Sequence, residues 1–229
     1  VEIKLKFIRN DDNFSLLAAS ALSNTYEIEI KNLKLSVRRV KIDPVVQASI
    51  ETTLKTKSSL YNITQSKIKT FMVPANTSSI NFPSVIQGNL PQSVIFGFVS
   101  DSGFTGKIEG NPFCFGHHNI NLFNAKINGI PILPTPFTPS YEADKLNFAR
   151  EYRWFMDNCG ISHENKSNGI TKKEFMTNSN FYVYDLTPDL CNSFHNHETK
   201  TGNLELDISF QTAPTNNIYL IVYASFPSV

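Results

Sequence analysis

Histidines are the side chains best suited to metal or acid–base chemistry in this chain of 229 residues. His195 and His197 stand two positions apart, so a strand would place both on one face, and Glu198 follows directly. Two histidines and a carboxylate are a weak match to a metal site. A complete set needs another carboxylate and a distant histidine, which cannot be placed. We interpret 192–200 as a polar loop and expect no bound metal and no cofactor.

Other candidate groups give even less chemistry. His117 and His118 are neighbours, so a strand would point them to opposite faces, away from a common ion. Asp185 and Asp189 could form a carboxylate pair, but the segment from 185 to 190 reads as a strand end, a rigid proline turn and an Asx-type cap. No activated serine or cysteine motif is present. We therefore predict no catalytic residues and no enzymatic activity.

Composition excludes further classes. Lys and Arg number 21 and Asp and Glu 20, so the net charge of +1 gives no field that would attract a nucleic acid backbone. The basic residues within 31–41 are interpreted as a solvated face or a partner contact. Three cysteines without CxxC spacing favour free thiols, and the glycines of 103–110 lack the spacing of a phosphate loop. No apolar run reaches the ~20 residues of a membrane helix.

Strand patterns dominate the chain. Apolar residues alternate with polar ones, or form short apolar runs, in 1–8, 26–40, 68–73, 93–99, 181–185, 204–210 and 218–226. Asn128-Gly129 predicts a hairpin within 120–132. Helices are expected at 44–58, where Asp43 can cap and Pro44 fits the first turn, and at 140–158, with a capping box at 171–174.

Eight or so strands with unequal loops predict an all-β fold, an antiparallel two-sheet jelly-roll sandwich with one or two short helices in its loops. We expect residues 1–229 to form this single domain. The core is predicted to contain Phe7, Ile28, Leu35, Phe96, Val183, Leu206 and Ile221. Because Val1 already lies inside a strand pattern, we also expect that something precedes it, as in a processed product or a domain cut from a longer chain.

Two loops are candidates for contacts with other molecules. One carries aromatic residues between strand patterns, where exposure is costly without a cover, and the other is a stiff proline-rich segment, 131–139, that could provide such a cover on a neighbour. Exposed aromatic anchors are frequent interface hot spots. The predicted assembly interface comprises Asn111, Pro112, Phe113, Phe115, Pro134, Pro136 and Phe137. The alternative, that Phe113 and Phe115 cap the chain's own sandwich, stays open.

Several stretches occur together in an informative order. They are LPQSVIFGFV at 90–99, DSGFTG at 101–106, NPFCF at 111–115, FYVYDLTPDL at 181–190, GNLEL at 202–206 and IVYASF at 221–226, with KFIR at 6–9, FSLL at 14–17 and LSVRRVKI at 35–42. In this order they resemble the C-terminal half of the jelly-roll capsid protein family of Maverick (Polinton) elements and adintoviruses, which also has copies in invertebrate genomes. The match spans about residues 5–226 and departs from the family pattern around 155–180.

The resemblance implies a virion shell protein that assembles inside the host cell. Shell proteins of that lineage pair two jelly rolls per chain and form trimers, so this chain would be the second jelly roll or a processed half, with itself and other capsid proteins as partners. Three alternatives stay open: a single-jelly-roll minor capsid or vertex protein, a glycan- or receptor-binding sandwich acting through loops 101–119 and 155–180, and a cupin-type enzyme.

Overall fold

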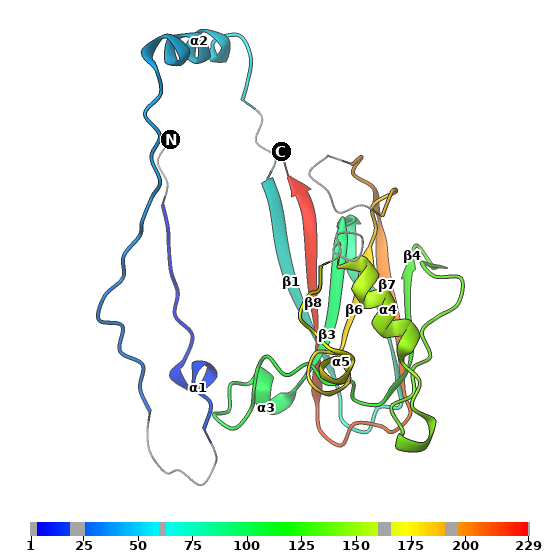
Figure 1. Cartoon of the computed structure of the whole chain (residues 1–229). Helices are drawn as coiled ribbons and strands as arrows, with labels where there is room; N and C mark the ends of the chain where they lie inside the picture. The colour runs from blue at the N-terminus through cyan, green and yellow to red at the C-terminus, as the bar shows by residue number, and fades with distance from the viewer. Residues whose placement is uncertain (1–3, 19–25, 60–62, 160–165, 191–196, 229) are drawn as a thin grey trace.

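A computed structural model describes residues 4–18, 26–59, 63–159, 166–190 and 197–228. Eight strands within these ranges form two antiparallel sheets of four strands each (Figure 1). The strands are β1 (Ile63–Val73), β2 (Ser79–Asn89), β3 (Ser93–Ser100), β4 (Ile120–Ile127), β5 (Ile130–Pro131), β6 (Phe181–Asp185), β7 (Thr201–Phe210) and β8 (Ile218–Ser228).

The strand order identifies the architecture. One sheet has the order β1-β8-β3-β6 and the other β2-β7-β4-β5, so successive strands mostly alternate between the sheets. The last two strands of the chain lie centrally, β8 between β1 and β3 and β7 between β2 and β4. An eight-stranded pair of sheets wound in this way is a jelly roll. The predicted all-β jelly-roll sandwich is confirmed.

Aromatic rings fill the space between the sheets. Phe96 of β3 and Phe123 of β4 face each other with ring centroids 5.4 Å apart, and Tyr182 stacks on Phe123 at 3.9 Å. All three side chains are buried, as are the inner residues of β7, Leu204, Leu206, Ile208 and Phe210. Because β6 alternates strictly, Tyr182 and Tyr184 point into this core while Val183 points to the opposite face of the sheet.

A second, smaller core covers the outer face of β3 and β6. It is formed by the helices α4 (Ala149–Asn158) and α5 (Lys172–Thr177), whose Phe155 and Phe175 pack against Val183. The indole N–H of Trp154 donates to the Val183 carbonyl at 2.7 Å, which occupies an acceptor of the last strand in that sheet. The expected capping box is present, since Thr171 and Glu174 bond each other's backbone N–H groups. The expected helix at 140–158 is shorter, with a 3-10 turn η1 (Ala143–Lys145) before α4.

Several core predictions are confirmed and others are wrong. Phe96 and Leu206 are buried in the core between the sheets, as expected. Val183 is buried as well, but in the second core on the outer face of β6, because Tyr182 and Tyr184 occupy the inward positions of that strand. Ile221 is only half-buried, because the inner positions of β8 are the even-numbered residues from 218 to 226, and Ile221 has the opposite phase. Phe7 is 73% exposed and Leu35 67% exposed. Ile28 is likewise only partly covered.

These misplaced residues belong to an arm, described for residues 4–18 and 26–59, that lies outside the sandwich (Figure 1). The arm contains two helices, α1 (Asp12–Ser15) and α2 (Pro44–Leu54), and its other described residues join no strand. Asp43 caps α2 through a 2.8 Å bond from the Val45 N–H, as expected, but the helix ends at Leu54 rather than at residue 58. The strands predicted at 1–8 and 26–40 are therefore unpaired in this chain wherever it is described.

Candidate assembly surfaces

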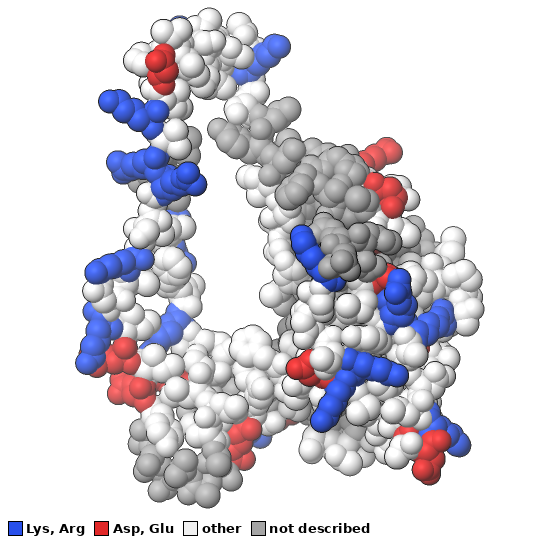
Figure 2. All heavy atoms as spheres, in the orientation of Figure 1, with Lys and Arg blue, Asp and Glu red and all other residues white. Residues whose placement is uncertain are grey.

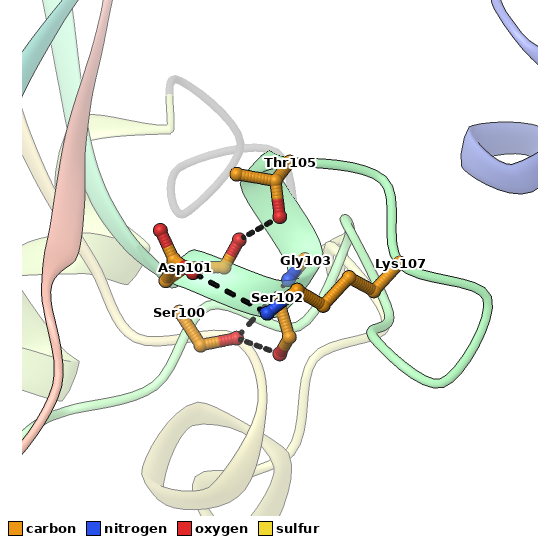
Figure 3. Close-up of polar contacts among 6 residues, drawn as sticks. All are labelled: Ser100, Asp101, Ser102, Gly103, Thr105 and Lys107. Atoms are coloured by element: carbon orange, nitrogen blue, oxygen red, sulfur yellow. Dashed lines mark hydrogen bonds and ion pairs between the residues drawn. The ribbon is translucent and has the colours of Figure 1, made fainter. Parts of the chain in front are cut away.

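The loop between β3 and β4 is stiffened before it reaches the predicted interface. Its helix α3 (Asp101–Phe104) is capped by the Ser100 hydroxyl, which accepts from the Gly103 N–H at 3.4 Å and lies 3.1 Å from the Ser102 hydroxyl (Figure 3). Lys107 reaches back to the Asp101 carboxylate at 3.7 Å (Figure 3). These local contacts hold the loop in one shape, and they form a structural cap rather than a reactive cluster.

The aromatic tip of this loop has two different faces. The Asn111 side chain accepts from the Phe113 N–H at 2.9 Å, an Asx turn that leaves the Phe113 ring 74% exposed beside the half-buried Pro112. Phe115, two residues on, packs instead on Phe181 with ring centroids 4.6 Å apart. Its main chain bonds to the segment before β6, donating to the Asn178 carbonyl at 2.8 Å. Phe113 is thus available to a partner, whereas Phe115 is mostly committed to the chain's own fold.

The proline-rich segment is held by the same molecule. Arg150 of α4 donates to the carbonyls of Thr135 at 2.7 Å and Pro136 at 3.0 Å, and its guanidinium lies 5.1 Å from the Phe137 ring. Phe137 is fully buried and its backbone pairs with Phe123 of β4 in both directions. The expectation that Phe137 contacts a neighbour is therefore wrong. Pro134 is exposed and Pro136 half-buried, so only the first of these prolines presents a free surface.

A larger apolar surface lies on the arm. Two segments in it, 5–8 and 26–42, expose large apolar side chains between charged ones, and Lys and Arg are spaced along the arm in Figure 2. The residues more than 40% exposed there are Leu5, Phe7, Ile8, Tyr26, Ile30, Leu33, Leu35, Val37, Val40 and Ile42. Their alternation is visible in the sequence, but none of these residues belongs to a strand of the sandwich. Monomeric proteins rarely leave so extended an apolar surface uncovered.

The arm meets the sandwich at the loop that carries α3, where Phe14 of α1 lies close to Gly106. The Ala18 N–H donates to the Ile108 carbonyl at 2.9 Å, and α1 lies near the loop that carries α3. Beyond this point Figure 2 shows open space between the arm and the sandwich. The Arg9 guanidinium donates to the Ile28 carbonyl, which joins the two extended parts of the arm to each other. The arm is thus connected to the sandwich around α1, while the apolar side chains of 5–8 and 26–42 stay largely exposed.

The described histidines contact aromatic or acidic side chains of the fold. His117 stacks on Tyr141 with ring centroids 4.1 Å apart, and burial lowers the pKa of His117 and of His118. His197 lies 3.3 Å from Asp189, while its expected companion His195 lies outside the described residues. No group of three or more metal-ligating side chains occurs in the part of the chain that the structure describes.

Asp185 forms the Asx-type cap that the sequence predicts at the end of β6. Its carboxylate accepts from the Thr187 N–H at 2.9 Å and from the Thr187 hydroxyl at 2.7 Å, which closes the turn after β6. Glu151 of α4 is a deeply buried carboxyl, at 5% exposure, and desolvation raises its pKa. We interpret both groups as parts of the scaffold, Asp185 because its carboxylate closes a turn and Glu151 because it is buried on α4 beneath the loop.

Comparisons with known proteins add little to this geometry. No protein-family description matches the chain, and no curated protein matches it. Among solved structures, a chain of the PBCV-1 virus capsid, a quasi-atomic model, is similar with 10% identity and a TM-score of 0.44. The similarity covers 78% of this chain and 51% of that one, so this chain spans about half of its length. The fold assignment rests on the strand order itself. No described helix is long and apolar enough to cross a membrane.

Proposed function

We propose that this chain is a structural capsid protein, a jelly-roll building block of a virion shell that works by self-association. The observation that carries the proposal is the exposed apolar surface on a chain whose sandwich is already complete. Phe113 at 74% exposure and Phe7 at 73% lie outside that core. Such side chains gain most when a second molecule removes them from water. A shell can be built from contacts of this kind because symmetry repeats each of them.

The sequence resemblance supports the finer assignment. The stretches at 90–115 and 181–190, which resemble the Maverick (Polinton) and adintovirus capsid family, are the ones that form β3, the loop with α3, and β6. We propose that the chain acts as the second jelly roll of such a protein, or as a processed half, in a trimer with other capsid proteins. Its location would be the virion, after assembly inside the host cell. A domesticated genomic copy would retain the same assembly chemistry.

Oligomerisation tests the proposal directly. Light scattering over a range of concentrations and electron microscopy of the purified chain should show trimers or larger shells. Phe113→Ala should reduce association without changing the melting temperature, since the ring is 74% exposed and truncating an interface anchor costs ~2 kcal/mol or more of binding. Leu146→Ala, at a 50% exposed residue in another loop, is the matched control and should leave association unchanged.

The possible results separate the alternatives. Pentamers rather than trimers would favour a single-jelly-roll vertex protein. A wild-type chain that stays monomeric at high concentration would contradict self-association of this chain. If Phe113→Ala lowers the melting temperature instead, the ring belongs to the fold, in agreement with the open alternative for Phe113 and Phe115.

A further inference from the structure

Strand β1 has a long free edge that no part of the described chain covers. The strands at the other ends of the two sheets are each blocked or short. β5 has two residues, β2 is interrupted around Pro83 by a register shift, and the Val183 carbonyl of β6 is occupied by Trp154. β1 instead pairs with β8 over its full length of 11 residues without a shift. Proteins normally block such an edge, because its unpaired N–H and C=O groups can receive another strand.

The two faces of β1 differ in their chemistry. Val73 belongs to the core between the sheets, so the odd-numbered residues of the strand point inward and the even-numbered ones point outward. The outward residues from 64 to 72 carry no charge, and Ile68 and Met72 among them are 65% and 50% exposed. The inward face carries Lys67 and Lys69. The edge therefore presents two positive charges on one side and an uncharged, partly apolar surface on the other.

Both lysines line a groove between the two sheets. The groove has a volume of about 440 Å³, and its lining includes Ile86 and Phe226. The Lys69 ammonium donates to the Val85 carbonyl at 3.0 Å, and the Lys67 ammonium lies 5.0 Å from the centroid of the Phe226 ring. Neither contact supplies a negative charge. A strand added to this edge would fit best with acidic side chains on the face that enters the groove.

Segment 26–30 of the arm has that pattern. Glu27 and Glu29 stand two positions apart, so an extended chain places both carboxylates on one face. The opposite face is apolar and consists of Tyr26, Ile28 and Ile30. The carboxylate of Glu29 lies 3.6 Å from the ammonium of Lys31, but both side chains are largely exposed, and a surface pair of this kind contributes little. The segment thus matches the β1 edge in charge on one face and in apolar character on the other.

We propose that segment 26–30 of one copy of the chain adds to the free edge of β1 in a second copy. In an antiparallel arrangement with Ile28 opposite Ile68, Glu27 lies opposite Lys69 and Glu29 lies opposite Lys67. Main-chain hydrogen bonds hold the added strand, and the two charge pairs set its register. Each copy gives an arm and receives one, so the contact can close into a ring. The inference rests on the proposed self-association and names one contact that produces it.

Two other occupants of the edge fit less well. If two β1 strands paired around a two-fold axis at Ile68, Lys67 of each copy would lie opposite Lys69 of the other, and like charges in this position are unfavourable. The arm of the same chain lies apart from its own β1. The Arg9 guanidinium donates to the Ile28 carbonyl within the arm, and Figure 2 shows open space between the arm and the sandwich. A second copy can meet both surfaces as they stand.

Charge reversal on the two sides tests the contact. The edge variant carries Lys67→Glu and Lys69→Glu, and the arm variant carries Glu27→Lys and Glu29→Lys. Sedimentation velocity over a range of concentrations measures the association of each variant alone and of their equimolar mixture. Alone, each variant should associate more weakly than the wild type by about tenfold or more, because like charges then face each other. The mixture should recover the association of the wild type, since every arm then meets an edge of opposite charge.

A matched control reverses two charges of the arm outside the paired segment. Lys34→Glu with Lys41→Glu changes the net charge by the same amount as the edge variant, and both lysines are exposed. This control should leave the association unchanged. Recovery in the mixture would also show that the edge and arm variants are folded, because misfolded chains would not complement each other.

The other results separate this contact from the shell role. Association that persists in both reversal variants but is lost in Phe113→Ala would overturn the arm contact and leave the proposed function standing. Weakened association that the mixture does not recover would also overturn it, since the charges would then act elsewhere. Recovery in the mixture without trimers or shells in electron microscopy would support the contact and contradict the shell role. A wild-type chain that stays monomeric at high concentration would overturn both.

Discussion

Replacing one buried phenylalanine of the sandwich and one exposed phenylalanine of the arm compares what the two regions contribute to the stability of the chain. Phe96 is fully buried, with ring centroids 5.4 Å from Phe123 and 6.1 Å from Tyr184. Truncating such a ring to alanine loses its transfer free energy and leaves a cavity, at a cost of ~3–5 kcal/mol. A domain of this size has a total stability of about 5–15 kcal/mol. Phe96→Ala should therefore remove a large part of it, or prevent soluble expression.

The melting temperature gives the direct measurement. At about 2–4 °C per kcal/mol for a chain of this length, Phe96→Ala should lower the melting temperature by roughly 6–20 °C. Urea unfolding followed by circular dichroism should give the same loss of free energy with an unchanged slope. Phe7→Ala is the matched control. With 73% of its side chain exposed and no place in the core, it should change stability by no more than about 0.5 kcal/mol.

Two outcomes would refute this reasoning. Wild-type stability in Phe96→Ala would mean that the ring does not lie in the core and that the inner phase of β3 is wrong. A loss for Phe7→Ala comparable to that for Phe96→Ala would mean that the arm folds onto this sandwich in the 229-residue chain.

Two further substitutions test local packing and charge. A Cβ at Gly97 would lie 2.6 Å from Cδ1 of Phe115, so Gly97→Ala should lower the free energy of unfolding, measured in urea, by ~1–3 kcal/mol. Adding Phe115→Ala should restore part of that loss, because it removes the clashing ring. Purely additive effects of the two substitutions would contradict the contact. Burial holds the pKa of Glu151 above its unfolded value, so the stability of the wild type should fall as pH rises from the unfolded pKa through the folded one. Glu151→Gln should therefore raise the melting temperature at pH 7 and leave it nearly unchanged at about pH 4. An equal effect at both pH values would exclude ionisation as the cause.

Most strands of the sandwich can be predicted because their patterns are local. The short apolar run that forms β3, the Asn128-Gly129 hairpin and the alternation of β7 each indicate a strand without tertiary information. β2 escapes prediction, because Pro83 and a register shift between Phe82 and Ile86 interrupt its alternation. The cap at Asp185 is predictable for the same reason as the hairpin, since its partner Thr187 lies two residues away.

The predicted interface shows where local patterns fail. Phe113 and Phe137 both lie in segments rich in loop-forming residues, and the sequence predicts a partner contact for both. Their surroundings differ because Phe137 pairs with the backbone of Phe123, a residue that is distant in sequence, while Phe113 belongs only to an Asx turn. Ile221 shows a related limit. β8 is apolar on both faces, so the sequence does not say which phase points inward.

The arm shows the strongest form of this limit. Alternation in a segment indicates that one face of the strand is buried, but it does not indicate which sheet packs against that face. Phe7 and Leu35 satisfy the same pattern as Leu206, yet Leu206 is fully buried and the other two are largely exposed. The difference lies in neighbours, because β7 has a strand on each edge and the arm has none in the described chain. The alternation of Phe7 and Leu35 therefore predicts an environment that the eight strands of this sandwich do not supply, and sequence alone could not reveal that.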